Sequence, residues 1–190
     1  MRERTTRMTN EMRDLARHYH SLGINIVPLG ADKRPVITGV APSGSPVRFR
    51  WEEWKEQRQS DMALRQILRP AWWSEVQGIA GVCGPVSGGL ACIDFDKTSY
   101  EIVEAFLGTL GLDEGYAWQV RTPGGGWHVW LRYPPLTMDV GKLRREARGG
   151  GHVELRWAGH YTALPGSVHP SGGVYEWVGD EPEEGPVCLG

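Results

Sequence analysis

The chain has 190 residues, 40% of them hydrophobic and 23% charged, and a net charge of −2 at pH 7. These totals are ordinary for one globular domain with a substantial core, and the net charge argues against a high-affinity nucleic-acid-binding protein. No apolar run approaches the ~20 residues that cross a bilayer, and the N-terminus lacks the apolar segment of a signal peptide.

The first elements expected are a helix, a strand and a long loop. Apolar residues recur at i, i+3 and i+4 spacing over residues 9–23 and predict a helix that Gly23 ends. Residues 24–29 (INIVPL) predict a short strand. Residues 30–49 are rich in Gly, Pro and Ser, so we expect a long loop there, either functional or disordered.

The rest of the chain predicts short helices and many strands. Helices are expected over 51–57, 60–68, 99–110 and, as a short basic helix, 139–147. Strands are expected over 78–84, 90–96, 116–122, 127–133, 152–157, 160–165 and 173–178. This order predicts an α+β fold of mostly antiparallel sheets flanked by helices. The domain would span 9–178, and the acidic, Pro-rich residues 179–190 would form a linker or chain end.

Two aspartates end the apolar strand LACIDFD. Alternation along a strand places Asp94 and Asp96 on one face, with Ile93 and Phe95 on the other. Carboxylates are natural ligands of Mg²⁺ or Mn²⁺, and two of them can bridge two metal ions. The alternative is a strand end that runs into a polar turn, with Asp96 capping the next helix.

A third acid follows three glycines in the segment GGGHVELRW. Glu154 would share one strand face with His152 and Arg156, which indicates a half-buried sheet with a polar face. The alternative for Glu154 is an ion pair with an arginine.

Loops between the later strands offer candidate phosphate contacts. The glycine triplet 124–126 lies between two predicted strands, so it is a hairpin connection rather than a dinucleotide-binding turn. It would let the backbone approach a phosphate while His128 projects from the next strand. Ser167 and His169 lie on a Pro- and Gly-bounded turn where they could contact a triphosphate. The alternatives are a structural histidine and a polar loop tip.

Aromatic and basic residues could contact nucleic acid. The chain has nine tryptophans, and an exposed indole can stack on a base. Those expected to be exposed are Trp72, Trp73 and Trp127. Three arginines of the predicted basic helix could follow a phosphate backbone or form a solvated face: Arg144, Arg145 and Arg148. The three cysteines are odd in number and far apart, which indicates a reducing, cytoplasmic location.

Five segments occur in a familiar order: GINIVPLGADKRP, SGGLACIDFD, TPGGGWHVW, VELR and LPGSVHPSGGVYEW. From about Leu15 to Trp177 the chain therefore resembles the bifunctional primase–polymerase (Prim-Pol) domain of the archaeo-eukaryotic primase superfamily. The resemblance implies a primase-like fold with an RRM-like catalytic core. It also implies a DNA primase/polymerase, which transfers nucleotides from (d)NTPs to a 3′-OH and initiates primers on a single-stranded DNA template. Such domains are often fused to a replicative helicase.

The family motifs map onto few residues. The first motif, two acids separated by one residue, falls on Asp94 and Asp96. The second, a small residue followed two positions later by histidine, falls on Gly126 and His128. The third, a hydrophobic residue followed by an acid, has Glu154 as its acid. The resemblance implies that the three acids bind two divalent metal ions, Mg or Mn, and should converge within metal-bridging distance. It also implies that His128 contacts the nucleotide phosphates. The family commonly has Asp in place of Glu154, and often Ser in place of Gly126, where only a backbone N–H remains.

Further nucleotide contacts are expected around this site: Gly125, Gly126, Arg156, Ser167, His169 and Lys33. Two other functions stay open. One is a catalytically inactive module that binds nucleotide or single-stranded nucleic acid. The other is a rolling-circle type nuclease, which needs two histidines one residue apart on a strand. The pair His18 and His20 has this spacing but lies on the predicted first helix.

Overall fold

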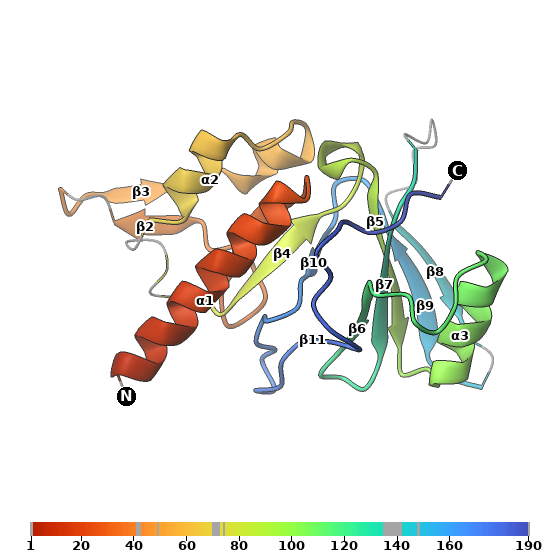
Figure 1. Cartoon of the computed structure of the whole chain (residues 1–190). Helices are drawn as coiled ribbons and strands as arrows, with labels where there is room; N and C mark the ends of the chain where they lie inside the picture. The colour runs from red at the N-terminus through yellow and green to blue at the C-terminus, as the bar shows by residue number, and fades with distance from the viewer. Residues whose placement is uncertain are drawn as a thin grey trace.

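The computed structural model describes residues 2–40, 43–48, 50–69, 73, 75–134, 142–147 and 149–189, with the side chains of 2–9, 40, 46, 47 and 142 excepted. Within these residues the fold is α+β, and its paired strands are antiparallel, as predicted (Figure 1). No helix in these ranges is both long and apolar enough to cross a membrane.

The larger sheet has six strands in the order β11-β6-β7-β5-β9-β8. Their bounds are β5 (Leu90–Asp96), β6 (Gln119–Arg121), β7 (Trp127–Arg132), β8 (Lys142–Glu146), β9 (His152–Arg156) and β11 (Glu176–Trp177). Helix α3 (Tyr100–Thr109) covers one face, where Ile93 and Phe95 pack with Val103 and Leu107. The strand alternation predicted for LACIDFD is thereby confirmed.

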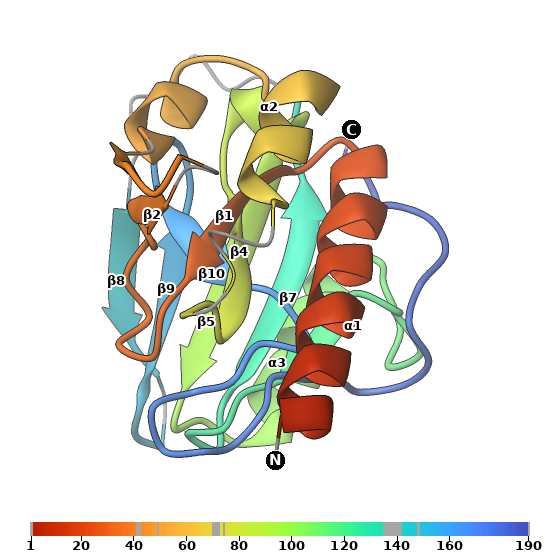
Figure 2. The ribbon, with the colours of Figure 1, turned by 90° about the vertical axis from the view of Figure 1, so that its left-hand side faces the viewer.

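A second, three-stranded sheet has the order β1-β4-β10 and lies beside helix α1 (Figure 2). Its strands are β1 (Asn25–Leu29), β4 (Gly78–Val82) and β10 (Tyr161–Ala163), and the helix α1 spans Arg2–Ser21. Every residue of β1 and β4 is buried, since both faces of this sheet are covered. The main core joins it to the apolar end of the larger sheet, where Cys92 and Trp130 are fully buried.

The first loop and the basic helix differ from the predictions. Within residues 30–49, β2 (Thr38–Val40) and β3 (Pro46–Arg48) form a hairpin. Residues 142–146 of the predicted basic helix form strand β8, whereas 139–141 lie outside the described residues. Pairing with β9 satisfies the backbone of β8, and this tertiary contact outweighs a modest local helix propensity.

Short helices fill the connections: η1 (Trp51–Lys55), α2 (Asp61–Ile67) and η3 (Pro85–Ser87). Ser60 caps α2, and its hydroxyl accepts a hydrogen bond from the N–H of Ala63.

The acidic tail packs on the domain. The indole of Trp118 donates to the carbonyl of Glu184 at 2.8 Å, and the backbone N–H of Arg132 donates to Val187 at 2.8 Å. The N–H of Leu189 in turn donates to Arg132 at 2.9 Å. These contacts attach the segment that we expected to be a linker to Trp118 and to the last residue of β7.

Candidate functional site

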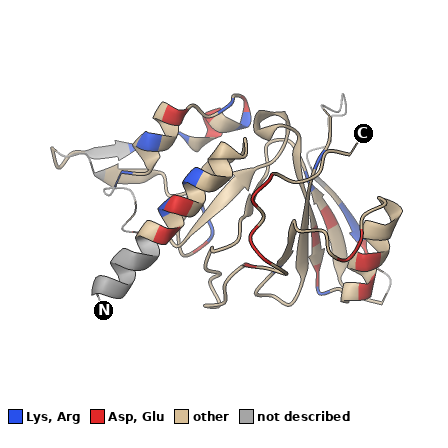
Figure 3. Cartoon of the chain, in the orientation of Figure 1, with Lys and Arg blue, Asp and Glu red and all other residues tan. Residues whose placement is uncertain are grey.

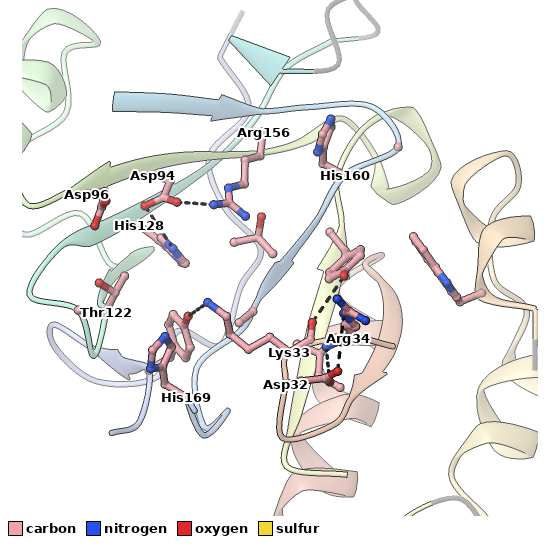
Figure 4. A pocket seen from close by; sticks show the side chains of 18 of the residues that line it. Asp32, Lys33, Arg34, Asp94, Asp96, Thr122, His128, Arg156, His160 and His169 are labelled. Atoms are coloured by element: carbon pink, nitrogen blue, oxygen red, sulfur yellow. Dashed lines mark hydrogen bonds and ion pairs between the residues drawn. The ribbon is translucent and has the colours of Figure 1, made fainter. Parts of the chain in front are cut away.

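A cleft of about 790 Å³ opens where the polar end of the larger sheet separates from the smaller one (Figure 4). One face of β5 carries Cys92, Asp94 and Asp96 in succession. Cys92 is buried between the sheets, whereas the two aspartates line the cleft. The same face of β5 is therefore part of the apolar core at Cys92 and lines the charged cleft at Asp94 and Asp96.

Three strands place acidic and imidazole groups in one row. Asp94 lies directly opposite His128 on β7 and Glu154 on β9, and residues that face each other in antiparallel strands share a sheet face. Asp96 lies opposite His152, and their Oδ2 and Nδ1 atoms are 3.6 Å apart. The sequence-predicted acids therefore lie on one face of two adjacent strands.

Arg156 joins two of these acids. Its Nη2 is 2.6 Å from Oδ2 of Asp94, and its Nε is 2.9 Å from Oε1 of Glu154. The Glu154 side chain is 4% exposed and does not line the cleft. Burial acts to lower the pKa of Arg156, but the charges of both carboxylates outweigh burial and raise it. The ion pair with an arginine, which was the alternative for Glu154, is thus present.

His128 is buried beside Asp94. Its Nε2 lies 3.6 Å from Oδ1 of Asp94, and its ring stacks on Tyr175 with centroids 5.5 Å apart. Burial lowers the pKa of His128 to about 4, despite the opposing effect of Asp94, so the ring is neutral at pH 7. Its Nδ1 is buried with no hydrogen-bond partner among the described residues.

Cationic side chains face the aspartates across the cleft. Lys33 sits in a tight turn with φ of 60°, a left-handed conformation that is uncommon outside glycine. Its ammonium lies 3.5 Å from the hydroxyl of Tyr175. His169 lines the same side, and burial and the nearby Lys33 lower its pKa. Lys33 and Arg34 therefore present positive charge to a space that Asp94 and Asp96 border on the other side (Figure 4). Asp32 lines the same wall, and its Oδ2 is 3.7 Å from Nε of Arg34.

Three of the expected phosphate contacts already have protein partners. Ser167 is 1% exposed, and its hydroxyl bonds both the N–H and the carbonyl of Ile79, each at 2.9 Å. The N–H of Gly125 donates to the carbonyl of Thr122, and the N–H of Gly126 donates to the Thr122 hydroxyl. The Ser167 hydroxyl thus fixes its loop to β4, and the two glycine N–H groups close the hairpin turn. In the ligand-free chain these groups stabilise the fold.

The aromatic predictions are partly wrong. Trp73 is 2% exposed, and its indole donates to the carbonyl of Ile67, so it belongs to the core. Trp127 is half-buried against Tyr100. Trp72 lies outside the described residues.

Two of the arginines predicted to contact nucleic acid lie on the edge strand β8, and the histidine pair considered for a nuclease lies on α1. Arg144 and Arg145 are exposed on β8, and Arg148 lies outside the described residues. Figure 3 shows where basic and acidic residues lie along the strands of this sheet. His18 contacts the carbonyl of Pro182, and His20 the carbonyl of Gln59, so neither approaches the cleft.

One wall of the cleft is aromatic, which no pattern in the sequence predicted. Trp51 meets Tyr161 edge-on with centroids 5.1 Å apart, and the ammonium of Lys55 lies 4.3 Å from the Trp51 ring centre. Tyr175 forms the floor between His128 and His169. These residues come from η1, β10 and the loop before β11, so no local spacing in the sequence connects them.

The carboxylates suit a divalent cation in part. Asp94 and Asp96 present oxygen atoms, the ligands that Mg²⁺ and Mn²⁺ prefer, to the same cleft. Glu154 lies on the same sheet face, but its carboxylate is paired with Arg156. Across the described ranges, no group of three or more His, Cys, Asp or Glu is arranged to hold a metal ion. The two aspartates therefore supply suitable oxygen ligands, but Arg156 is paired with Asp94 as well as with Glu154, so cation binding by these acids stays a prediction.

The sequence matches the model of one known protein family. The family model described as "Bifunctional DNA primase/polymerase, N-terminal" matches residues 16–187, which is most of the chain. No curated protein matches the sequence.

Proposed function

The chain belongs to the bifunctional DNA primase/polymerase family, and on this premise we propose that it is a template-directed nucleotidyltransferase that makes and extends primers on single-stranded DNA. The observation that carries the proposal is the cleft in which Asp94 and Asp96 face a cationic wall. A (d)NTP has the matching chemistry, because its triphosphate needs both cations from the protein and metal ions held by carboxylates.

The cationic wall would bind the triphosphate. Lys33 supplies fixed positive charge, Arg34 adds a guanidinium that is paired with Asp32, and His169 borders the same space. Charge-assisted hydrogen bonds of this kind are about twice as strong as neutral ones. His128 is neutral at pH 7, so it would donate one hydrogen bond to a phosphate oxygen rather than add charge.

The aspartates would hold the metal ions, Mg²⁺ or Mn²⁺. When bound, such ions supply charge neutralisation at the phosphates and lower the pKa of the attacking 3′-OH. The protein itself contributes mainly position: β5 pairs on both sides with β7 and β9, so the two carboxylates project from the rigid centre of the sheet. Groups on such a scaffold keep their geometry without reorganisation.

Contacts to the template would lie outside the cleft. We propose that Arg144 on the exposed edge strand β8 contacts template phosphates, because it is a solvent-accessible cation opposite Glu154 and so on the sheet face that carries the site. Arg145 lies on the other face, opposite Val153. A replicative helicase, fused or separate, stays a proposed partner.

A primer-synthesis assay on single-stranded DNA tests the function. Purified protein is incubated with labelled dNTPs or NTPs and with Mg²⁺ or Mn²⁺, and products are resolved by length. Asp94→Asn keeps the shape of the side chain and should reduce incorporation by roughly 100-fold or more, since it removes the charge of a metal ligand. The exposed loop acid Asp113 provides the matched control, and Asp113→Asn should retain activity. Full activity in Asp94→Asn would contradict the proposal.

A second candidate is the inactive nucleotide-binding module. The pairing of Arg156 with both Asp94 and Glu154 favours it, because those carboxylates are already neutralised. This candidate predicts nucleotide binding in the cleft with no product on any template, so the same assay together with a binding isotherm separates the two.

A further inference from the structure

Two carboxylates and one guanidinium form a compact group beside the cleft. Asp94 and Glu154 are cross-strand partners, and their side chains are only 13% and 4% exposed. Like charges directly opposite each other in a sheet are destabilising, and burial increases their repulsion. Arg156 donates a hydrogen bond to Asp94 and forms an ion pair with Glu154, so it acts as their shared counter-ion.

The guanidinium is also a neighbour of the proposed triphosphate site. Arg156 itself lines the cleft, with its side chain 31% exposed, whereas Glu154 does not line it. Its long, flexible side chain borders the space that Lys33 and His169 face from the other side (Figure 4). The planar fork of arginine binds carboxylates and phosphates with the same geometry. One side chain therefore lies within reach of two kinds of anion.

We propose that Arg156 is an exchangeable counter-ion: it neutralises Asp94 and Glu154 in the ligand-free chain and passes to the triphosphate when a divalent cation neutralises the acids. This inference rests on the proposed function. The cation and the guanidinium compete for the same carboxylates, whereas the cation and the triphosphate assist each other through the release of Arg156. The residue is thus a positioning residue that couples the two ligands.

The exchange predicts opposite effects of one substitution. In Arg156→Gln, a cation no longer has to displace the guanidinium, so Mn²⁺ alone should bind on the order of tenfold more tightly. Without metal, Arg156 stays on the carboxylates, so its removal leaves Asp94 and Glu154 uncompensated and their charges repel a nucleotide. The affinity for dATP in EDTA should therefore fall by a similar factor. Simple damage to the site would weaken both.

The experiment uses Mn²⁺ alone and dATP in EDTA as separate probes, each measured by isothermal titration calorimetry. Arg121→Gln is the matched control, because Arg121 is an exposed arginine of the same sheet that does not line the cleft. We expect it to match the wild type with both probes. Tighter Mn²⁺ binding and weaker dATP binding in Arg156→Gln support the exchange, whereas unchanged or weaker Mn²⁺ binding overturns it.

A measurement on the wild type covers the case in which Arg156→Gln does not fold. The Nε–H resonance of Arg156, assigned by comparison with Arg156→Lys, should shift when Mg²⁺ is added, because its contact with Glu154 is lost. A resonance that stays in place at saturating Mg²⁺ overturns the exchange, even if primer synthesis is normal. Absence of primer synthesis with a normal Mg²⁺-dependent shift overturns only the proposed function.

Discussion

Three consecutive glycines of the β6–β7 turn should respond differently to alanine, for physical reasons that the structure separates. A Cβ on Gly126 would lie 2.2 Å from the carbonyl oxygen of Phe95 and 3.2 Å from Cα of Asp96. Contacts shorter than about 3.0 Å are essentially never seen, so the backbone of β5 or β7 must move by roughly 0.8 Å. Such overpacking costs about 1–3 kcal/mol.

The neighbouring glycines have space around them. Gly125 has φ of +81° and no atom within 4 Å of an added Cβ, so alanine there incurs only the left-handed backbone cost of about 1–2 kcal/mol. Gly124 has no unusual φ, and its nearest neighbour is the Thr122 hydroxyl at 4.0 Å, so Gly124→Ala should change stability by less than about 0.5 kcal/mol.

Thermal unfolding followed by circular dichroism measures the series. For a chain of this length, each kcal/mol shifts Tm by about 2–4 °C, so Gly126→Ala should melt roughly 2–12 °C below Gly124→Ala. Because the displaced backbone carries Asp96, Gly126→Ala should also reduce primer synthesis more than Gly125→Ala does. If Gly126→Ala melts together with Gly124→Ala, the close packing of the turn on β5 is not present in solution.

Two further predictions concern stability away from the cleft. Ser167→Ala leaves the buried N–H of Ile79 without its hydrogen-bond partner, so the free energy of unfolding measured in urea should fall by about 1–3 kcal/mol. The affinity for nucleotide should not change. A loss of nucleotide affinity without a loss of stability would instead support the phosphate contact predicted for Ser167. Burial lowers the pKa of His20, so the unfolded chain takes up that proton first and the folded chain should lose stability as pH falls below about 6.5. His20→Gln should reduce this loss, measured as urea midpoints at about pH 7.5 and about pH 5.5, and an unaltered pH dependence would contradict the assignment.

Local pattern alone predicted much of the β5 strand and its surroundings. The alternation in LACIDFD correctly placed Ile93 and Phe95 in the core and both aspartates on the other face. Glu154 and Arg156 were correctly placed on one strand face. These features depend on the two-residue period of a single strand, which every β-strand shares.

Contacts between residues that are distant in the chain could not be predicted from such local patterns. The sequence allowed Glu154 either a metal ion or an arginine, and the geometry of Arg156 shows that the arginine is present. Ser167 looked like a loop-tip hydroxyl, but packing against β4 buries it. The predicted basic helix became β8 because β9 offers an unpaired edge, which no local propensity reports.

The sequence by itself therefore determined which residues share each strand face, because that follows from backbone geometry within one element. The tertiary structure alone decided that Lys33, Tyr175 and Trp51 meet the aspartates across one cleft. Those contacts depend on how two sheets pack and diverge, and that arrangement is set by burial of the core that they share rather than by spacing along the chain.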